Sequence, residues 1–311
     1  MAFNEQPRTY AAAHFALELD GKRDVGLFKS IEGGGVKADV MTYQNGANYE
    51  RWRSLGKQKY EDLKLQVGMA MSPPFYQWIE QFFTGKGERK NGAIVAADFY
   101  YNERARREFT EALIKELTFP KLDGSDPGAV YMSIGVAVED LVFKKGGGQK
   151  LPQSPGTDQQ KLWYANNFRF RLDGYDQACR RTSKVDSFTI KQNIIEHHVG
   201  GRQSPIKTPS QIDFPSLSFY VPEADAQPFF DHHTRRAMQS NREQKPSGGQ
   251  TGMLEVFDHE GKTLFTLEFY GAEIFNVAPE RSDAKSEEIK LVKVEVWTES
   301  MKFSYGGGPR V

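Results

Sequence analysis

Two short stretches decide the fold: Phe15-Ala16-Leu17-Glu18-Leu19-Asp20-Gly21 and, in the second half of the chain, Phe168-Arg169-Phe170-Arg171-Leu172-Asp173-Gly174. In both, apolar side chains alternate with others before an Asp-Gly pair, the pattern of a strand that enters a tight hairpin turn. At nearly the same spacing along the chain, Leu63, Leu65 and Val67 are matched by Leu217, Phe219 and Val221. The sequence therefore predicts a duplicated β unit.

A longer match, without gaps, runs through the second part of each unit at a slightly larger spacing. It pairs Gly92 with Gly252, Asp98 with Asp258, Glu108 with Glu268, Phe109 with Phe269, Ala112 with Ala272, Glu139 with Glu299, Phe143 with Phe303, and Gly146-Gly147-Gly148 with Gly306-Gly307-Gly308. The spacing changes within one segment of the repeat, which is residues 68–91 in the first unit and 222–251 in the second. We therefore predict one insertion in that segment. Gln149–Gln160 is polar and rich in proline and glycine, as linkers are. We divide the chain into domains 1–150 and 161–311, joined by a linker at 151–160.

One helix is predicted in each unit among strands of period two. Ser72-Pro73-Pro74 can start a helix whose apolar face holds Phe75, Trp78, Ile79, Phe82 and Phe83 and which stops at Gly85. The second unit has a weaker counterpart between Pro222 and about Ser240. The predicted fold is mainly β: two tandem antiparallel β-barrel or sandwich domains, each with one short α-helix.

Composition narrows the class of protein. The chain has 311 residues, with 41 Lys and Arg against 41 Asp and Glu, so it has no long-range field for nonspecific binding of nucleic acid or a membrane surface. Its single cysteine, Cys179, allows no intrachain disulfide. No apolar run approaches the about 18 residues of a membrane span, and Met1–Ala13 lacks a signal-peptide pattern. We expect folding and assembly in the cytoplasm and no membrane insertion.

Residues for catalysis, cofactors or metals do not form a recognisable motif. None of the histidines has metal-ligand spacing, and we expect His197, His198, His232 and His233 to be solvated. Gly85–Lys90 follows a helix and lacks the Gly-Lys-Ser/Thr of a phosphate loop. We interpret the triple glycines as flexible exits and Glu139 and Glu299 as solvent-facing or lumen-facing strand residues. The sequence thus predicts no enzyme, no cofactor and no metal site.

The order of these elements, repeated twice, resembles the tail-tube family of contractile phages, with the related tubes of contractile injection systems and type VI secretion. The residues that carry the resemblance are the Asp-Gly strand at Phe15–Gly21, the segment Phe28–Gly35, the hairpin loop at Tyr43–Gly46 and at His197–Arg202, and Pro209–Leu217. The resemblance implies rings that stack into a hollow conduit for DNA or protein, in a virion or an extracellular particle. It implies as partners the chain itself and the sheath, baseplate and terminator proteins of a tail.

Two alternatives stay open beside a tube subunit with three chains and pseudo-sixfold symmetry. One is a baseplate hub or tube-initiating component, and the other is a two-domain β-sandwich module that binds a ligand. For the tube, we predict that two polar, glycine-bearing loops contact neighbouring subunits. Their residues are Gln44, Asn45, Gly46, Arg51, Trp52 and Arg53, and His197, His198, Gly200, Gly201 and Arg202.

Overall fold

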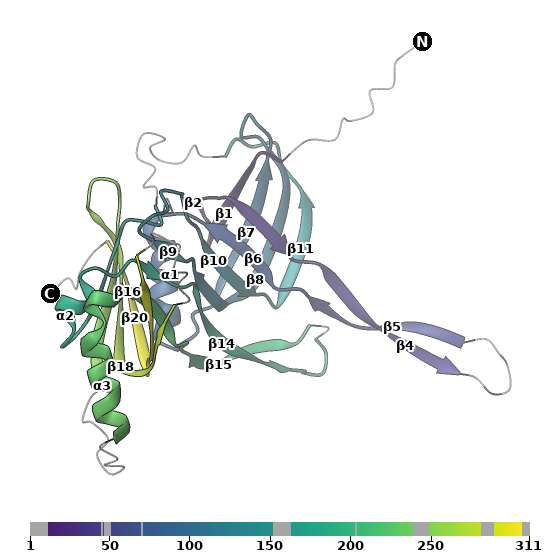
Figure 1. Ribbon diagram of the computed structural model, residues 1–311. Helices are drawn as coiled ribbons and strands as arrows, with labels where there is room; N and C mark the ends of the chain where they lie inside the picture. Colours follow the sequence, from purple (N-terminus) through teal and green to yellow (C-terminus); the bar gives the residue numbers. More distant parts are fainter. Residues whose placement is uncertain are drawn as a thin grey trace.

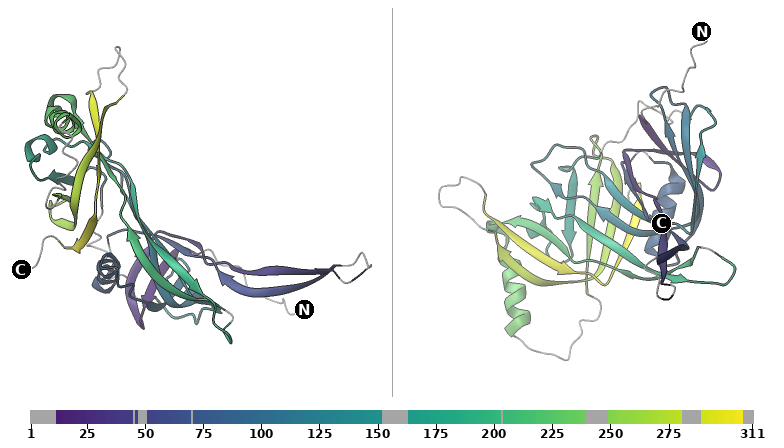
Figure 2. Two further views of the ribbon diagram at one scale, coloured as in Figure 1. Left: turned by 90° about the horizontal axis from the view of Figure 1, so that it is seen from below. Right: turned by 90° about the vertical axis from the view of Figure 1, so that its right-hand side faces the viewer.

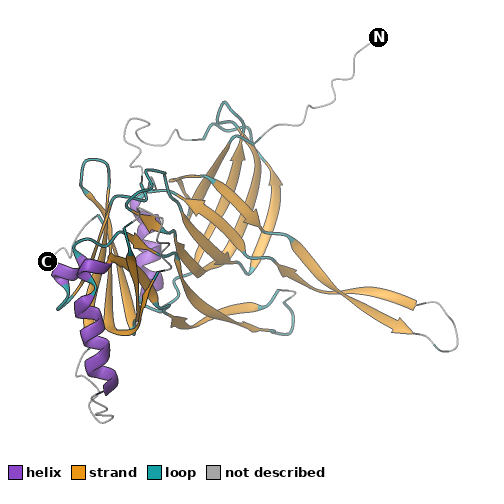
Figure 3. Cartoon of the chain, in the orientation of Figure 1, coloured by secondary structure: helices purple, strands orange, loops and turns teal. Residues whose placement is uncertain are grey.

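The computed structural model describes residues 12–44, 46, 51–69, 71–151, 163–202, 204–238, 249–280 and 289–306. Antiparallel strands dominate it, as predicted (Figure 3). The first half contains β1 (His14–Leu19), β2 (Lys22–Phe28), β3 (Ser30–Gly33), β4 (Val36–Gln44), β5 (Arg51–Tyr60), β6 (Leu63–Val67), α1 (Pro73–Phe83), β7 (Lys90–Ala97), β8 (Glu103–Phe119), β9 (Leu122–Asp123), β10 (Met132–Ala137) and β11 (Asp140–Lys145). The second half contains β12 (Phe168–Leu172), α2 (Asp176–Cys179), β13 (Lys184–Val185), β14 (Phe188–His197), β15 (Ile206–Asp213), β16 (Leu217–Pro222), a 3₁₀ turn (Glu223–Asp225), α3 (Gln227–Met238), β17 (Gln250–Phe257), β18 (Thr263–Pro279), β19 (Leu291–Trp297) and β20 (Ser300–Tyr305).

The first half is a nearly closed barrel. Its strands follow the order β2-β1-β7-β8-β10-β6-β3. Because β2 and β3 are separated only by Lys29, whose N–H donates to the Gln66 carbonyl at 2.8 Å, the last strand of the series returns to the first. Closure of this kind leaves few exposed strand edges.

The second half repeats the order of the strands. Its strands run in the order β12-β17-β18-β19-β16-β13, which is the order β1-β7-β8-β10-β6-β3 of the first half, and β9 of the first half pairs with β13 at the end of this sheet. One element differs, because the short helix α2 stands where the first half has β2. The sequence did not predict α2.

Pairing between strands repeats as the sequence match predicts. Phe109 of β8 lies opposite Gly92 and Leu141. Its counterpart Phe269 of β18 lies opposite Gly252 and Met301, which are the counterparts of those two residues. Both glycines are needed where they stand, because a Cβ on Gly92 or Gly252 would meet the facing phenylalanine ring at 2.7 Å or less. The equivalent strands of the two halves thus share one register.

A bend in the long central strand also recurs. Glu111 in β8 has a φ of 52°, in the left-handed region that side chains other than glycine seldom adopt. Its counterpart in β18, Gly271, has a φ of 63°. Both sit at a shift of the ladder with the preceding strand, as at a β-bulge. The bend lets one strand pair with two different sets of neighbours along its length.

Helix α1 forms as the sequence predicts. It spans Pro73–Phe83, and all five side chains of the predicted apolar face are buried. Gly85 follows with a φ of 73°, and its N–H donates to the Phe82 carbonyl at 3.1 Å. The helix does not serve its own barrel alone, however, because it also packs on β20 of the second half.

One hydrophobic core extends through both halves. It includes Leu17 and Phe109 from the first half and Phe170, Phe265 and Phe303 from the second. Figure 2 shows the halves side by side, with the hairpin β4–β5 standing clear of both. The sequence predicts two domains, and the continuity of the core between the halves is a finding of the structure.

Candidate functional site: two hairpins and the surfaces that receive them

The hairpins β4–β5 and β14–β15 are built alike. Val40 faces Leu55 and Thr42 faces Arg53 in the first. In the second, the counterparts of these residues in the repeat form the same pairs, because Ile194 faces Pro209 and Glu196 faces Lys207. Even the shift in the ladder lies at the same place, between Ala38 and Val40 and between Gln192 and Ile194. The two hairpins are therefore equivalent elements of the repeat.

Their surroundings differ. The hairpin β4–β5 projects away from the chain (Figure 1), and nearly all of its side chains are exposed. Among the described strands, β4 and β5 pair only with each other. The hairpin β14–β15 instead lies against the first half, where β14 pairs with the end of β8. The second half thus reaches over the first with its hairpin, while the first extends its hairpin into solvent.

Backbone pairing and packing attach β14 to β8. Ile190 lies opposite Leu117, and both are fully buried. The hydroxyl groups of Thr118 and Thr189 lie 2.8 Å apart and share a hydrogen bond. Phe119 stacks on Phe188 with ring centroids 5.0 Å apart. The end of β8 is therefore covered by a strand that comes from the other half.

A buried carboxylate fixes the far strand of this hairpin. Glu139 is 1% exposed and accepts the backbone N–H of Lys207 at 2.7 Å. Arg202 and Arg89 pair with the same carboxylate at 3.6 and 3.9 Å, and Arg89 also donates to the Lys207 carbonyl at 2.6 Å. The interpretation of Glu139 as a solvent-facing or lumen-facing strand residue is wrong, because the second hairpin covers it.

The side chain of Lys207 is buried in the same contact. Its ammonium group lies 3.7 Å from Asp62, in the turn between β5 and β6. Asp62 also binds Lys115 at 2.6 Å, and this hydrogen bond raises the pKa of Lys115. The junction between hairpin and barrel is therefore ionic at this point, with one carboxylate between two cations.

A second contact between the halves runs in the opposite direction. Helix α1 covers β20, with Tyr76 stacked on Tyr305 at 3.6 Å between ring centroids and Phe83 on Phe303 at 6.0 Å. The Glu80 carboxylate accepts the backbone N–H of Tyr305 at 3.2 Å. The first half thus contributes a helix to the junction and the second half contributes a hairpin.

The counterparts of both receiving surfaces are uncovered. In β18, Glu273–Pro279 pairs with β19 on one side, and no described strand occupies the other side. Phe143 of β11 is 55% exposed, whereas its counterpart Phe303, covered by α1, is 2% exposed. On the second half, Phe275 and Trp297 stack in solvent at 5.9 Å and are 40% and 49% exposed. Exposed apolar groups beside an unpaired strand edge are typical of surfaces that bind a partner.

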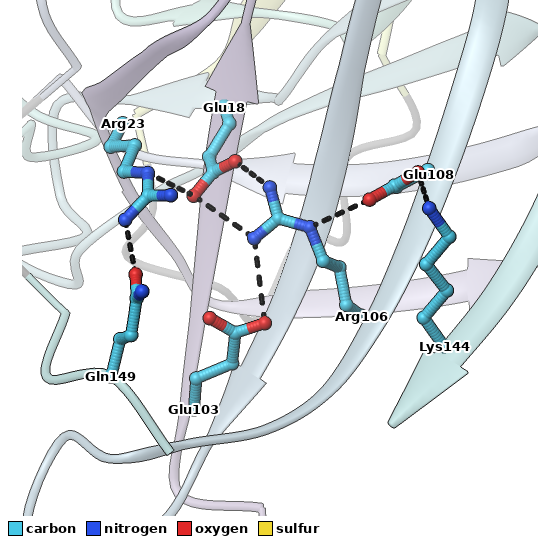
Figure 4. Close-up of polar contacts among 7 residues, drawn as sticks. All are labelled: Glu18, Arg23, Glu103, Arg106, Glu108, Lys144 and Gln149. Atoms are coloured by element: carbon cyan, nitrogen blue, oxygen red, sulfur yellow. Dashed lines mark hydrogen bonds and ion pairs between the residues drawn. The ribbon is translucent and has the colours of Figure 1, made fainter. Parts of the chain in front are cut away.

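A charged network links side chains of β1, β2, β8 and β11 and of the segment after β11 (Figure 4). Glu18 alternates along β1 with the core residues Leu17 and Leu19, so the network lies on the opposite face of the sheet. At its centre the Arg106 guanidinium pairs with Glu18 and, at 3.4 Å, with Glu103. Burial by itself lowers the pKa of Arg106, but the hydrogen bond and charge of Glu18 outweigh this effect and raise it. The other members are Arg23, Glu108, Lys144 and Gln149.

The network helps to hold the segment that leaves the first barrel. Gln149 accepts a hydrogen bond from Arg23, and its carbonyl accepts the Glu103 N–H at 2.8 Å. The Gly146 N–H donates to the Arg104 carbonyl at 2.9 Å, and Leu151 is 5% exposed. The first triple glycine is therefore fixed to β8, so its interpretation as a flexible exit is wrong. Residues 152–160 of the predicted linker lie outside the described residues.

The predicted loop residues divide between strands and turns. Gln44 ends β4, and Arg51, Trp52 and Arg53 begin β5, where Trp52 is 67% exposed. Gly46 is exposed with a φ of 60°, and Asn45 lies outside the described residues. His197 ends β14, and His198, Gly200, Gly201 and Arg202 lie beyond it before β15. The structure places Arg202 against Glu139 of the same chain.

The residues that receive a hairpin were not singled out for that role by the sequence. The sequence predicts Glu139 and Glu299 as solvent-facing or lumen-facing strand residues, and it gives Phe275 and Trp297 no specific role. One difference between the repeats lies at this surface, because Phe275 of the second half stands where the first half has Lys115. An aromatic ring in place of a charged side chain indicates that the two equivalent positions contact different groups.

Metal sites and membrane-spanning helices can be sought only among the described residues. Within them, no three His, Cys, Asp or Glu side chains gather as a metal site would require. None of the helices there has the length and hydropathy to cross a membrane.

His232 is not solvated as predicted, because its ring bonds to the Tyr175 hydroxyl at 2.6 Å and to Glu273 at 2.8 Å.

The single cysteine is predicted to be unreactive in the folded chain. Cys179 is 2% exposed, and burial raises the pKa of its thiol to about 12. At pH 8 about one thiol in ten thousand is then ionised. We expect dithionitrobenzoate to leave the native protein unlabelled and to react with one equivalent after denaturation. Rapid labelling of the native chain would contradict the burial of this side chain.

Comparison with known proteins gives one family. Residues 11–142 match the family described as T4-like virus tail tube protein gp19. They belong to the tail-tube family. These residues include the hairpin β4–β5, the strand β8 that receives β14, and the members of the charged network other than Lys144 and Gln149. The comparison with curated proteins gave no match.

Several solved structures are similar to part of the chain. The sheath–tube complex of an extracellular contractile injection system in the extended state has 15% identity and a TM-score of 0.38, over 45% of this chain and 93% of that one. The tube-terminating cap of the anti-feeding prophage has 16% identity and a TM-score of 0.38, over 47% of this chain and 100% of that one. An Hcp protein has 14% identity and a TM-score of 0.24, over 38% and 68%.

Proposed function

We propose that the chain is a structural subunit of a contractile-tail tube and that it acts by assembly, without chemical turnover. Its rings would stack into a hollow conduit for DNA or protein cargo. They would assemble in the cytoplasm and act in a virion or an extracellular particle, in contact with the sheath, baseplate and terminator proteins of a tail. The family of residues 11–142 supports this proposal.

The proposal includes two tandem tail-tube-like domains. The repeated strand order and register support a second domain at 161–311. The first domain then extends to Leu151, which is buried against the sheet of the first half. The linker becomes correspondingly shorter than the predicted one at 151–160.

One observation carries the ring. Within the chain, hairpin β14–β15 of the second half is seated on β8 of the first. The equivalent hairpin β4–β5 and the equivalent edge of β18 are left over, one in each half and far apart in Figure 1. If both hairpins bind to equivalent strands of the repeat, hairpin β4–β5 of one chain lies on β18 of the next chain. Such head-to-tail contacts close into a ring or continue as a helical filament.

We predict a ring of three chains. Two domains per chain then give six similar positions, with contacts within and between chains in alternation. Native mass spectrometry of the smallest assembly should give three copies of the 35.3-kDa chain, and negative-stain images should show rings or rods. Six chains would mean instead that the fusion joins successive layers of the tube. Small particles without a hole would refute the tube.

A further inference from the structure

Glu139 has a counterpart in the second half whose side chain has no partner among the described residues. This counterpart, Glu299, lies between β19 and β20, and its backbone N–H donates to the Tyr270 carbonyl at 3.0 Å. Glu139, between β10 and β11, donates in the same way to Thr110 at 3.2 Å. Glu139 is buried beneath the second hairpin, whereas the Glu299 side chain is exposed and forms no hydrogen bond or ion pair with a described residue. The same backbone position thus occurs once with a hairpin and once without.

The residue that would reach Glu299 follows from the register of the hairpins. Glu139 accepts the N–H of Lys207, which pairs with Glu196 across β14–β15. The residue at this place in the other hairpin is Arg53, which pairs with Thr42 across β4–β5. A hairpin β4–β5 seated on β18 as β14–β15 is seated on β8 brings the backbone N–H of Arg53 to Glu299.

The side chain of Arg53 would also find a different environment from that of Lys207. The Lys207 ammonium group lies beside Asp62 together with Lys115. At the counterpart of Lys115 stands Phe275, stacked on Trp297 in solvent. A planar guanidinium packs well on an aromatic face, which a compact ammonium does less readily. Two differences between the repeats therefore complement each other: arginine replaces lysine in the hairpin, at Arg53, and phenylalanine replaces lysine in the strand, at Phe275.

We propose that Glu299, Phe275 and Trp297 form a receptor site for Arg53 on hairpin β4–β5 of a second copy of this chain. Glu299 accepts the backbone N–H, and the aromatic pair covers the guanidinium. The site rests on the proposed function, because it forms only where chains meet. Within one chain the hairpin projects away from the second half (Figure 1), so the occupant comes from another copy.

A disulfide tests whether the two strands meet. Val36 and Val277 are the counterparts of Ile190 and Leu117, which lie directly opposite each other. Chains with Val36→Cys and Val277→Cys together should form covalent dimers and trimers on oxidation. Val36→Cys with Ala278→Cys is the matched control, because neighbouring residues of a strand face opposite sides. Equal cross-linking in both pairs, or in neither, would refute this register and with it the receptor site.

Substitution of the receptor residues tests the site itself. In sedimentation experiments, Glu299→Ala and Phe275→Ala should each raise the concentration at which rings dissociate by about tenfold or more. Arg53→Ala should do the same, whereas Arg53→Lys should recover only part of the loss. Glu260→Ala, at another exposed carboxylate of the second half, is the control and should change nothing. Each variant should unfold at the wild-type temperature, because these side chains are exposed in the single chain.

The outcomes separate the two proposals. If the cysteine pair cross-links and rings form, but Glu299→Ala and Phe275→Ala dissociate as the wild type does, the receptor site is wrong and the tube subunit stands. If the wild-type chain stays a monomer at every concentration, both are wrong.

Discussion

A chain in which residues 39–57 are replaced by Asn-Gly is expected to fold normally and to remain a monomer. Ala38 and Gln58 lie opposite each other in the hairpin, and Asn-Gly favours a two-residue turn between paired strands. Nearly all of the described residues in the deleted segment are exposed, so its loss removes little of the core. The expected effect is complete loss of rings in native mass spectrometry, with unchanged circular dichroism.

The same change in the other hairpin is the matched control. Gln192 and Ile212 are opposite each other in β14–β15, so Asn-Gly can replace residues 193–211. This variant loses the contact of Lys207 with Glu139 and is expected to unfold at a lower temperature than the wild type. Rings that persist in the 39–57 variant, or equal loss of stability in both, would contradict the different roles of the hairpins.

The second large effect is expected for Phe119→Ala. Phe119 is 1% exposed, and its ring lies 5.0 Å from Phe188, 5.7 Å from Phe265 and 6.3 Å from Phe303. These three rings belong to the second half, so truncation opens a cavity at the junction. We expect the free energy of unfolding to fall by about 3–5 kcal/mol in urea denaturation.

Phe143→Ala is the control for this prediction. Phe143 is 55% exposed in the single chain, so its truncation should leave the free energy of unfolding of the monomer within about 0.5 kcal/mol of the wild type. A small effect of Phe119→Ala, comparable to that of Phe143→Ala, would mean that the halves are not packed through this ring.

Local patterns were enough for the repeat and for its elements. Alternation before Asp-Gly at Phe15–Gly21 and Phe168–Gly174 predicts β1 and β12 because strand side chains point to opposite faces in turn. Spacing of apolar residues after Pro73 predicts α1 because three to four residues make one turn. Both signals lie within a short stretch of sequence, so no distant partner is needed to see them.

The sequence also determined the tail-tube resemblance through the order of these elements, and residues 11–142 confirm it. It could not determine where each hairpin ends, because Arg51–Arg53 have a loop-like composition and still pair with Thr42–Gln44. Side chains that are exposed on both faces leave no alternation to reveal such a strand.

Only the tertiary structure decided which positions are buried. Phe143 and Phe303 have the same residue type and the same place in the repeat, yet one is exposed and the other is covered by α1. Glu139 and Glu299 differ in the same way, because hairpin β14–β15 lies over only the first. Burial of a residue depends on which element packs against it from far along the chain. A repeated sequence pattern predicts the same burial in both halves and cannot show this difference. Whether one of these repeated surfaces is covered or exposed therefore depends on how the two halves pack together.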